Sequence, residues 1–89
     1  MSYYLINYDL IRDKDYSRIQ YGIDATTIKS IKVLFSTWLV ESDMSAFDLT
    51  VALLKFIDAD DKILVSGVDR ESIAWLNIED DASRWLLNI

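Results

Sequence analysis

The first strand-like segment of the chain, residues 2–8, carries apolar side chains on both of its faces. Tyr3 and Leu5 share one face and Ile6 and Tyr8 share the other, because successive side chains of a strand point to opposite sides of a sheet. A strand of this kind is expected in the centre of a sheet, with other structure covering each face. The N-terminal segment therefore predicts a layered fold built around this strand.

The rest of the chain predicts helices and strands that follow one another through short loops, because it contains no Pro and only two Gly. In chain order, the predicted elements are a helix through Ile23 begun by Asp15, a β-prone run over 31–41, a helix over 46–57 capped by Ser45, strands over 62–68 and 73–78, and a final helix begun by Asp80 or Asp81. Ser36 and Thr37 interrupt the long run and indicate a bend or bulge. Gly22 is expected to weaken the first helix by about 1 kcal/mol relative to Ala.

This order predicts a single α+β domain over residues 1–89, a ferredoxin-like βαββαβ sandwich followed by a short C-terminal strand and helix. Helices cover one sheet face in such a sandwich, and we expect the other face to be open and apolar. A second copy of the chain is a common way for a small domain to hide such a surface. We therefore predict a homodimer, with Tyr8 of the first strand among its interface residues.

The helix predicted after Ser45 carries apolar side chains on two nearly opposite arcs. At about 100° per residue, one arc faces the core, and Phe47, Val51 and Leu54 fill the other. A helix that is apolar all round is usually buried all round. The second arc is either covered by Trp85 and Leu86 of the last helix, or it is a contact surface for another protein or for a second copy.

The amino-acid composition excludes several classes of function. The chain has no Cys and no His, which excludes disulfides, thiolate metal sites, a Cys nucleophile and a Ser-His-Asp triad. Its net charge of −6 repels a phosphate backbone, so we expect no direct binding to nucleic acid. No apolar run approaches the ~20 residues of a membrane span, and the start has no basic signal region. We expect a cytoplasmic protein without a cofactor that acts through contacts rather than catalysis.

Acidic residues gather in the predicted turns and at the ends of elements. The predicted acidic face consists of Asp58, Asp60, Asp61, Asp69, Glu71, Asp80 and Asp81. A calcium loop starting at Asp58 would need Gly and Glu where Ile63 and Asp69 stand, which favours a solvated turn. The acidic residues either keep the protein in solution or occupy the basic, nucleic-acid-binding groove of another protein. Viral inhibitors of bacterial defence systems, such as anti-CRISPR proteins, can act in the second way.

Five segments of the chain resemble, in order, a family of known proteins. These segments are YLINYDL at 4–10, STWLV at 36–40, DMSA at 43–46, DDKILV at 60–65 and DASRWL at 81–86. They are similar to the small CRISPR-associated endonuclease-like proteins, the ferredoxin-fold subunit of the spacer-adaptation complex, and more closely to their stand-alone bacterial relatives. The resemblance implies a homodimer in which Asp9 faces its symmetry mate and is associated with a divalent metal such as Mg²⁺ and with nuclease activity.

Three functions follow from these observations. The first is a non-catalytic, homodimeric protein-interaction module similar to the CRISPR-adaptation family. The second is an acidic inhibitor of a nucleic-acid-binding protein. The third is a metal-dependent nuclease that uses Asp9. The chain departs from the nucleic-acid-handling members of the family in its acidic composition and in residues 20–31, which favours the first function over the third.

Overall fold

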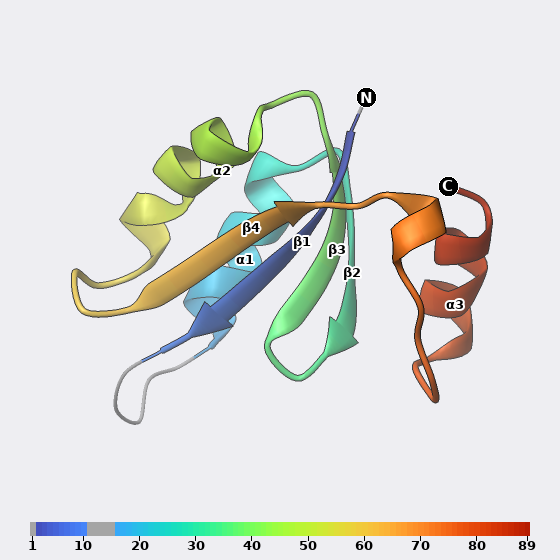
Figure 1. Ribbon diagram of the computed structural model, residues 1–89. Coiled ribbons are helices and arrows are strands. Elements are labelled where there is room, and N and C mark those ends of the chain that lie inside the picture. The colour runs from blue at the N-terminus through green and yellow to red at the C-terminus, as the bar shows by residue number, and fades with distance from the viewer. Residues whose placement is uncertain (1, 11–15) are drawn as a thin grey trace.

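The computed structural model describes residues 2–10 and 16–89. Its elements are β1 (Ser2–Asp9), α1 (Ser17–Thr26), β2 (Lys29–Leu34), β3 (Thr37–Ser42), α2 (Ala46–Leu53), the 3-10 turn η1 (Leu54–Phe56), β4 (Lys62–Gly67), the 3-10 turn η2 (Arg70–Ser72) and α3 (Asp80–Leu87) (Figure 1). The four strands form one sheet in the order β2-β3-β1-β4, and all neighbouring pairs are antiparallel. The predicted α+β class is confirmed.

The central position predicted for β1 is also confirmed, because β1 pairs with β3 on one side and with β4 on the other. Figure 1 shows α1 and α2 on one side of the sheet, where they cover the main core. Its completely buried members include Ile6, Ile19, Ile23, Leu49 and Leu53. Removing these side chains from water is the main favourable contribution to folding.

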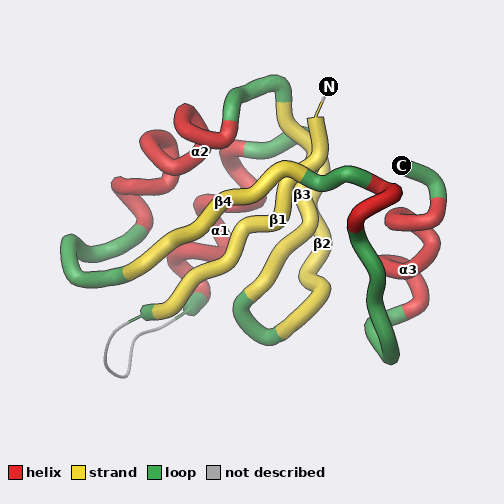
Figure 2. The backbone as a smooth tube through the Cα atoms, viewed as in Figure 1, coloured by secondary structure: helices red, strands yellow, loops and turns green. Residues whose placement is uncertain are grey.

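The second face of the sheet is not left open as the sequence predicted. α3 lies against this face, on the opposite side of the sheet from α1 and α2 (Figures 1 and 2). Leu39, Ala82 and Leu86 are buried, and the ring of Trp85 packs edge-on against Tyr3 with centroids 6.1 Å apart. The C-terminal helix therefore forms a second, smaller core on the face that was expected to meet a partner.

The predicted strand over 73–78 is wrong. The last ladder bond after β4 runs from the amide of Val68 to the carbonyl of Tyr3, at 2.9 Å, and the chain then turns through η2. Asn77 has a φ of 61°, in the left-handed region, which an extended strand does not tolerate. Of the apolar residues in this segment, Ile73, Trp75 and Ile78 are partly buried above the second face of the sheet, whereas Ala74 and Leu76 are exposed, so the apolar run does not reflect strand pairing.

The β-prone run over 31–41 forms parts of two strands rather than one. The chain turns at Phe35 and Ser36, and the Ser36 carbonyl accepts a hydrogen bond from the amide of Tyr8 at 3.1 Å. The β2–β3 register shifts between Lys32 and Leu34, so the irregularity lies slightly earlier than predicted.

The predicted cap of α2 is confirmed, because Ser45 Oγ accepts a hydrogen bond from the amide of Asp48 at 3.1 Å. The N-cap of α3 is Glu79, not Asp80 or Asp81 as predicted, and the Glu79 side chain makes no capping hydrogen bond. The predicted cap at Asp15 lies outside the described residues. No helix in the described part of the chain is long and apolar enough to cross a membrane.

Gly22 of α1 lies against Phe56 of η1. A Cβ atom added at Gly22 would overlap Cβ and the ring of Phe56. The absence of a side chain therefore permits this contact between the two segments. The expected weakening of α1 by Gly22 is only one part of its effect, because the glycine also makes room for Phe56.

Candidate protein-interaction surface

The outer side of α2 and η1 presents three large apolar side chains to solvent, here called the α2 stripe. Phe47 is 73% exposed, Val51 49% and Leu54 60%. Leu49 and Leu53, on the opposite side of the helix, are completely buried. The sequence pattern thus predicted both arcs correctly, and the second arc is the exposed one.

The alternative that Trp85 and Leu86 cover the α2 stripe is wrong. Trp85 packs on Tyr3 of β1, and the ammonium group of Lys29 on β2 lies 4.4 Å from the centroid of its indole ring. These contacts hold α3 against the second sheet face, with the sheet between α3 and α2 (Figure 1). The α2 stripe therefore remains available to a second molecule.

Tyr8 does not belong to this exposed surface. Its side chain is 5% exposed, and it lies in the main core under the helices. Its hydroxyl accepts a hydrogen bond from Trp38 Nε1 at 3.2 Å, and its ring lies 5.7 Å from that of Tyr16. The hydroxyl of Tyr8 thus finds its hydrogen-bond donor inside the core. Tyr8 therefore offers no surface for the interface role that the sequence predicted.

Asp9 lies exposed at the end of β1, next to the edge strand β4. Its cross-strand neighbour is Lys62, so the two opposite charges lie on the same face of the sheet. Among the described residues, the one group of three or more acidic side chains that converges does not include Asp9. Opposite charges at directly opposite positions of two strands attract weakly, and this is the one relation that the register gives Asp9.

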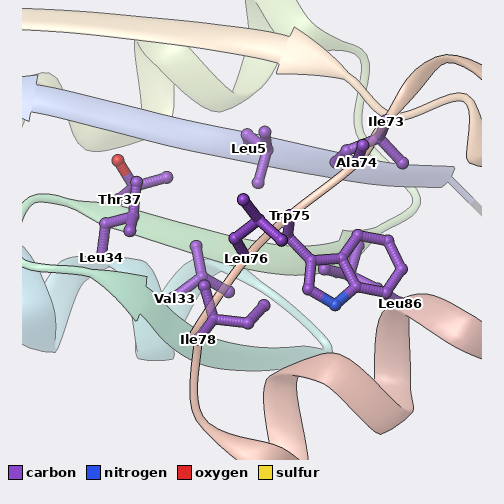
Figure 3. A pocket seen from close by; sticks show the side chains of 10 residues that line it. All are labelled: Leu5, Val33, Leu34, Thr37, Ile73, Ala74, Trp75, Leu76, Ile78 and Leu86. Carbon is purple, nitrogen blue, oxygen red and sulfur yellow. The ribbon is translucent and has the colours of Figure 1, made fainter.

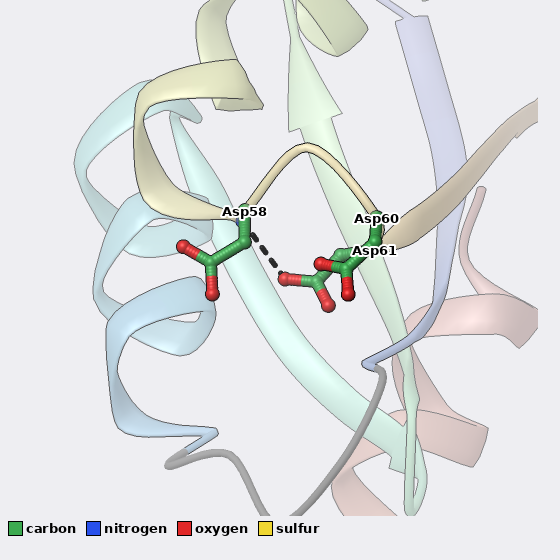
Figure 4. A group of neighbouring side chains, drawn as sticks. All are labelled: Asp58, Asp60 and Asp61. Carbon is green, nitrogen blue, oxygen red and sulfur yellow. Dashed lines mark hydrogen bonds between the residues drawn. The ribbon is translucent and has the colours of Figure 1, made fainter.

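The converging acidic group consists of Asp58, Asp60 and Asp61, whose carboxylates each place an oxygen within 4.8 Å of the others (Figure 4). Asp61 Oδ2 accepts a hydrogen bond from the amide of Asp58 at 2.8 Å, and the Asp61 amide donates to the Asp58 carbonyl at 3.1 Å. Arg18 Nη1 lies 3.7 Å from Asp58 Oδ1, and an exposed ion pair of this kind contributes little to the stability of the fold. These contacts close the turn before β4, and exposed carboxylates alone do not define a metal site.

The other residues of the predicted acidic face lie elsewhere. Asp69 caps η2, with Oδ1 accepting from the amide of Glu71 at 3.1 Å, and it follows the far end of β4. A six-residue strand is roughly 20 Å long, so this cap is well separated from the turn at Asp58. Asp80 and Asp81 lie in the first turn of α3. The acidic residues are spread over three places rather than gathered in one patch.

No protein-family model, no curated protein and no solved structure matches this chain.

An apolar cavity of about 270 Å³ separates the second sheet face from the segment that follows η2 (Figure 3). Its lining has no charged side chain and consists of Leu5, Val33, Leu34, Thr37, Ile73, Ala74, Trp75, Leu76, Ile78 and Leu86. The indole of Trp75 donates to Ser83 Oγ at 3.0 Å, which ties this wall to α3. The sequence did not predict the cavity, because it predicted a paired strand where the segment passes over the sheet.

The free edge of β4 is a further feature that the sequence did not reveal. β4 is the last strand on its side of the described sheet, and its outer backbone groups face away from β1. Strand order depends on which segments pair across the whole chain. The sequence of β4 alone, Lys-Ile-Leu-Val-Ser-Gly, gives no sign of whether it lies at an edge or in the centre.

Proposed function

We propose that this protein is a non-catalytic, homodimeric protein-interaction module with a ferredoxin-like fold, similar to the CRISPR-adaptation family. The observation that carries this proposal is the exposure of the α2 stripe, three large apolar side chains that no described part of the chain covers. Contiguous apolar side chains on the surface of a small domain are typical of a protein-protein contact.

The arrangement of the strands supports the ferredoxin-like part of the proposal. The β1-α1-β2 unit has β3 between its two strands, and the β3-α2-β4 unit has β1 between its two strands. Two such split βαβ units in one antiparallel sheet are the pattern of a ferredoxin-like fold. The short α3 is then an addition after the second unit.

The proposal is tested by Phe47→Asp and Leu54→Asp. Phe47 lies in the first turn of α2, where an added carboxylate interacts favourably with the helix N-terminus, so Phe47→Asp should remain folded. We expect the wild-type chain to sediment as a dimer across a concentration series. Either substitution places a charge in the apolar contact, so we expect each variant to sediment as a folded monomer.

Leu76→Asp is the matched control, because Leu76 is 88% exposed and lies after η2, away from α2. This variant should sediment like the wild type. A wild-type chain that remains monomeric at every concentration would contradict the proposed dimer. Dimers of unchanged stability in both stripe variants would show that the α2 stripe is not part of the contact.

A further inference from the structure

The two edges of the sheet differ in how they are protected against pairing with another strand. The β2 edge carries Lys29 and Lys32, has a register irregularity after Lys32, and lies beside α3. Charges, bulges and covering helices are the usual means by which proteins block an edge strand. The β4 edge has an unbroken register with β1 from Lys62 to Gly67, and its one charged residue is Lys62 at the end.

The backbone of β4 alternates between groups that face β1 and groups that face outward. The amide of Val68 donates to the carbonyl of Tyr3 of β1, which fixes the phase of the alternation. In an antiparallel pair, every second residue directs both its N–H and its C=O to the neighbouring strand. Leu64 and Ser66 therefore bond to β1, and the outward residues are Ile63, Val65 and Gly67. Outward groups of this kind form a template for another strand.

We propose that β4 pairs antiparallel with β4 of a second copy of this chain, around a two-fold axis at Val65. This inference rests on the proposed homodimer and assigns its contact. In this register Val65 lies opposite Val65 of the second copy, and Ile63 lies opposite Gly67. Each of these pairs exchanges both of its outward hydrogen bonds, so all three outward residues are satisfied in both copies. A two-fold axis at Leu64 would leave Gly67 unpaired.

The side chains of β4 fit this register. On the helix-facing side, a β-branched Val65 meets its own copy, a favourable cross-strand pair. Ile63 meets Gly67, where an added Cβ would have no neighbour within 4 Å, so there is room for the larger side chain. On the other side, Leu64, which is 66% exposed, lies opposite Ser66. Within residues 62–68 no like charges oppose each other, because Lys62 falls opposite Val68, and the first like-charged positions, Asp61 and Asp69, lie beyond the paired strand.

The same pairing places the α2 stripe next to the interface. α2 packs on β4 as well as on α1. A two-fold axis at the β4 edge therefore continues the sheet from one copy into the other and brings the two α2 helices to the same face, on either side of the axis. The stripe lies on the side of α2 opposite the buried Leu49 and Leu53, so it faces away from the sheet. In the proposed dimer the two stripes therefore flank the paired strands on the helix-covered side.

Single cysteines test the register, because the chain has no Cys of its own. In the proposed dimer, the two copies of position 65 lie about 5.5 Å apart at Cα, within the range of a disulfide, whereas those of position 64 are diagonal neighbours at about 7–8 Å. Under mild oxidation we expect Val65→Cys to give a covalent dimer as the main product, and Leu64→Cys to remain mostly uncrosslinked. Faster crosslinking of Leu64→Cys would overturn the register.

Amide hydrogen exchange in the wild-type chain tests the pairing without substitution. As concentration moves the chain from monomer to dimer, exchange at Ile63, Val65 and Gly67 should slow on the order of tenfold or more, and that at Leu64 and Ser66 should change little. A chain that remains monomeric contradicts the proposed function. A dimer without this alternating protection overturns the edge pairing and leaves the proposed function standing. Protection that appears only when another protein is added overturns self-pairing in favour of capture of a foreign strand.

Discussion

Leu86→Ala is expected to lower the free energy of unfolding by about 2–3 kcal/mol, and Leu87→Ala by less than about 0.5 kcal/mol. Leu86 is 2% exposed against the second face of the sheet, and Leu87, the next residue, is 59% exposed. The expected loss lies at the low end of the usual range for a buried Leu, because Leu86 borders the apolar cavity and has fewer atoms to contact. Urea unfolding followed by circular dichroism measures both variants.

The pair of neighbouring leucines separates the docking of α3 from its helical propensity. Both substitutions place the same good helix former at adjacent positions, so they differ in burial and hardly in propensity. In a domain of this size, a loss of 1 kcal/mol lowers the melting temperature by about 4–8 °C, so the difference is easily measured. Equal, small effects of both substitutions would mean that α3 contributes little to the stability of the sheet.

Gly22→Ala is expected to destabilise the protein by about 1–2 kcal/mol, although alanine is the better helix former. Helix propensity alone favours the substitution by about 1 kcal/mol. The new methyl group, however, overlaps Phe56 at its Cβ and ring, atoms near the backbone that cannot move without displacing η1. Overpacking of this kind costs about 1–3 kcal/mol, and the displaced contact between α1 and η1 adds to the loss. Denaturant unfolding gives the sign directly.

Two further variants show whether Phe56 is the cause. At Gly67 an added Cβ has no neighbour within 4 Å, so Gly67→Ala should leave the stability of the monomer nearly unchanged. In a Phe56→Ala background, the overlap with the ring is removed and only the contact with Cβ at 2.8 Å remains, so Gly22→Ala should be clearly less destabilising than in the wild type. A Gly22→Ala variant more stable than the wild type would show that α1 and η1 separate easily.

The sequence predicts the fold best where a local pattern and the tertiary structure agree. Apolar residues on both faces of β1 require two covering layers, and the Ser45 cap fixes the start of α2. The prediction fails at 73–78, where a run of apolar residues passes over a sheet face without pairing and Asn77 breaks the extension. It also misjudges Gly22, because propensity describes an isolated helix and the contact with Phe56 depends on distant residues.

The candidate surface is predicted in part for the same reason. The two arcs of α2 follow from helical spacing, so the α2 stripe could be named from the sequence. Which arc is exposed depends on where α3 packs, and the free edge of β4 depends on the order of all four strands. The exposed arc and the free edge both depend on contacts between segments that are distant in the sequence, and no local sequence pattern predicts such contacts.

The central position of the N-terminal strand has a consequence for synthesis on the ribosome. β1 leaves the ribosome before its partners β3 and β4, which end at Ser42 and Gly67, so both of its sides can be paired only after Gly67 has been synthesised. Long-range pairing of this kind slows folding and leaves an apolar strand exposed meanwhile. A nascent chain stalled before β4 would carry an unprotected β1, and such stalled chains are the ones we expect chaperones to bind.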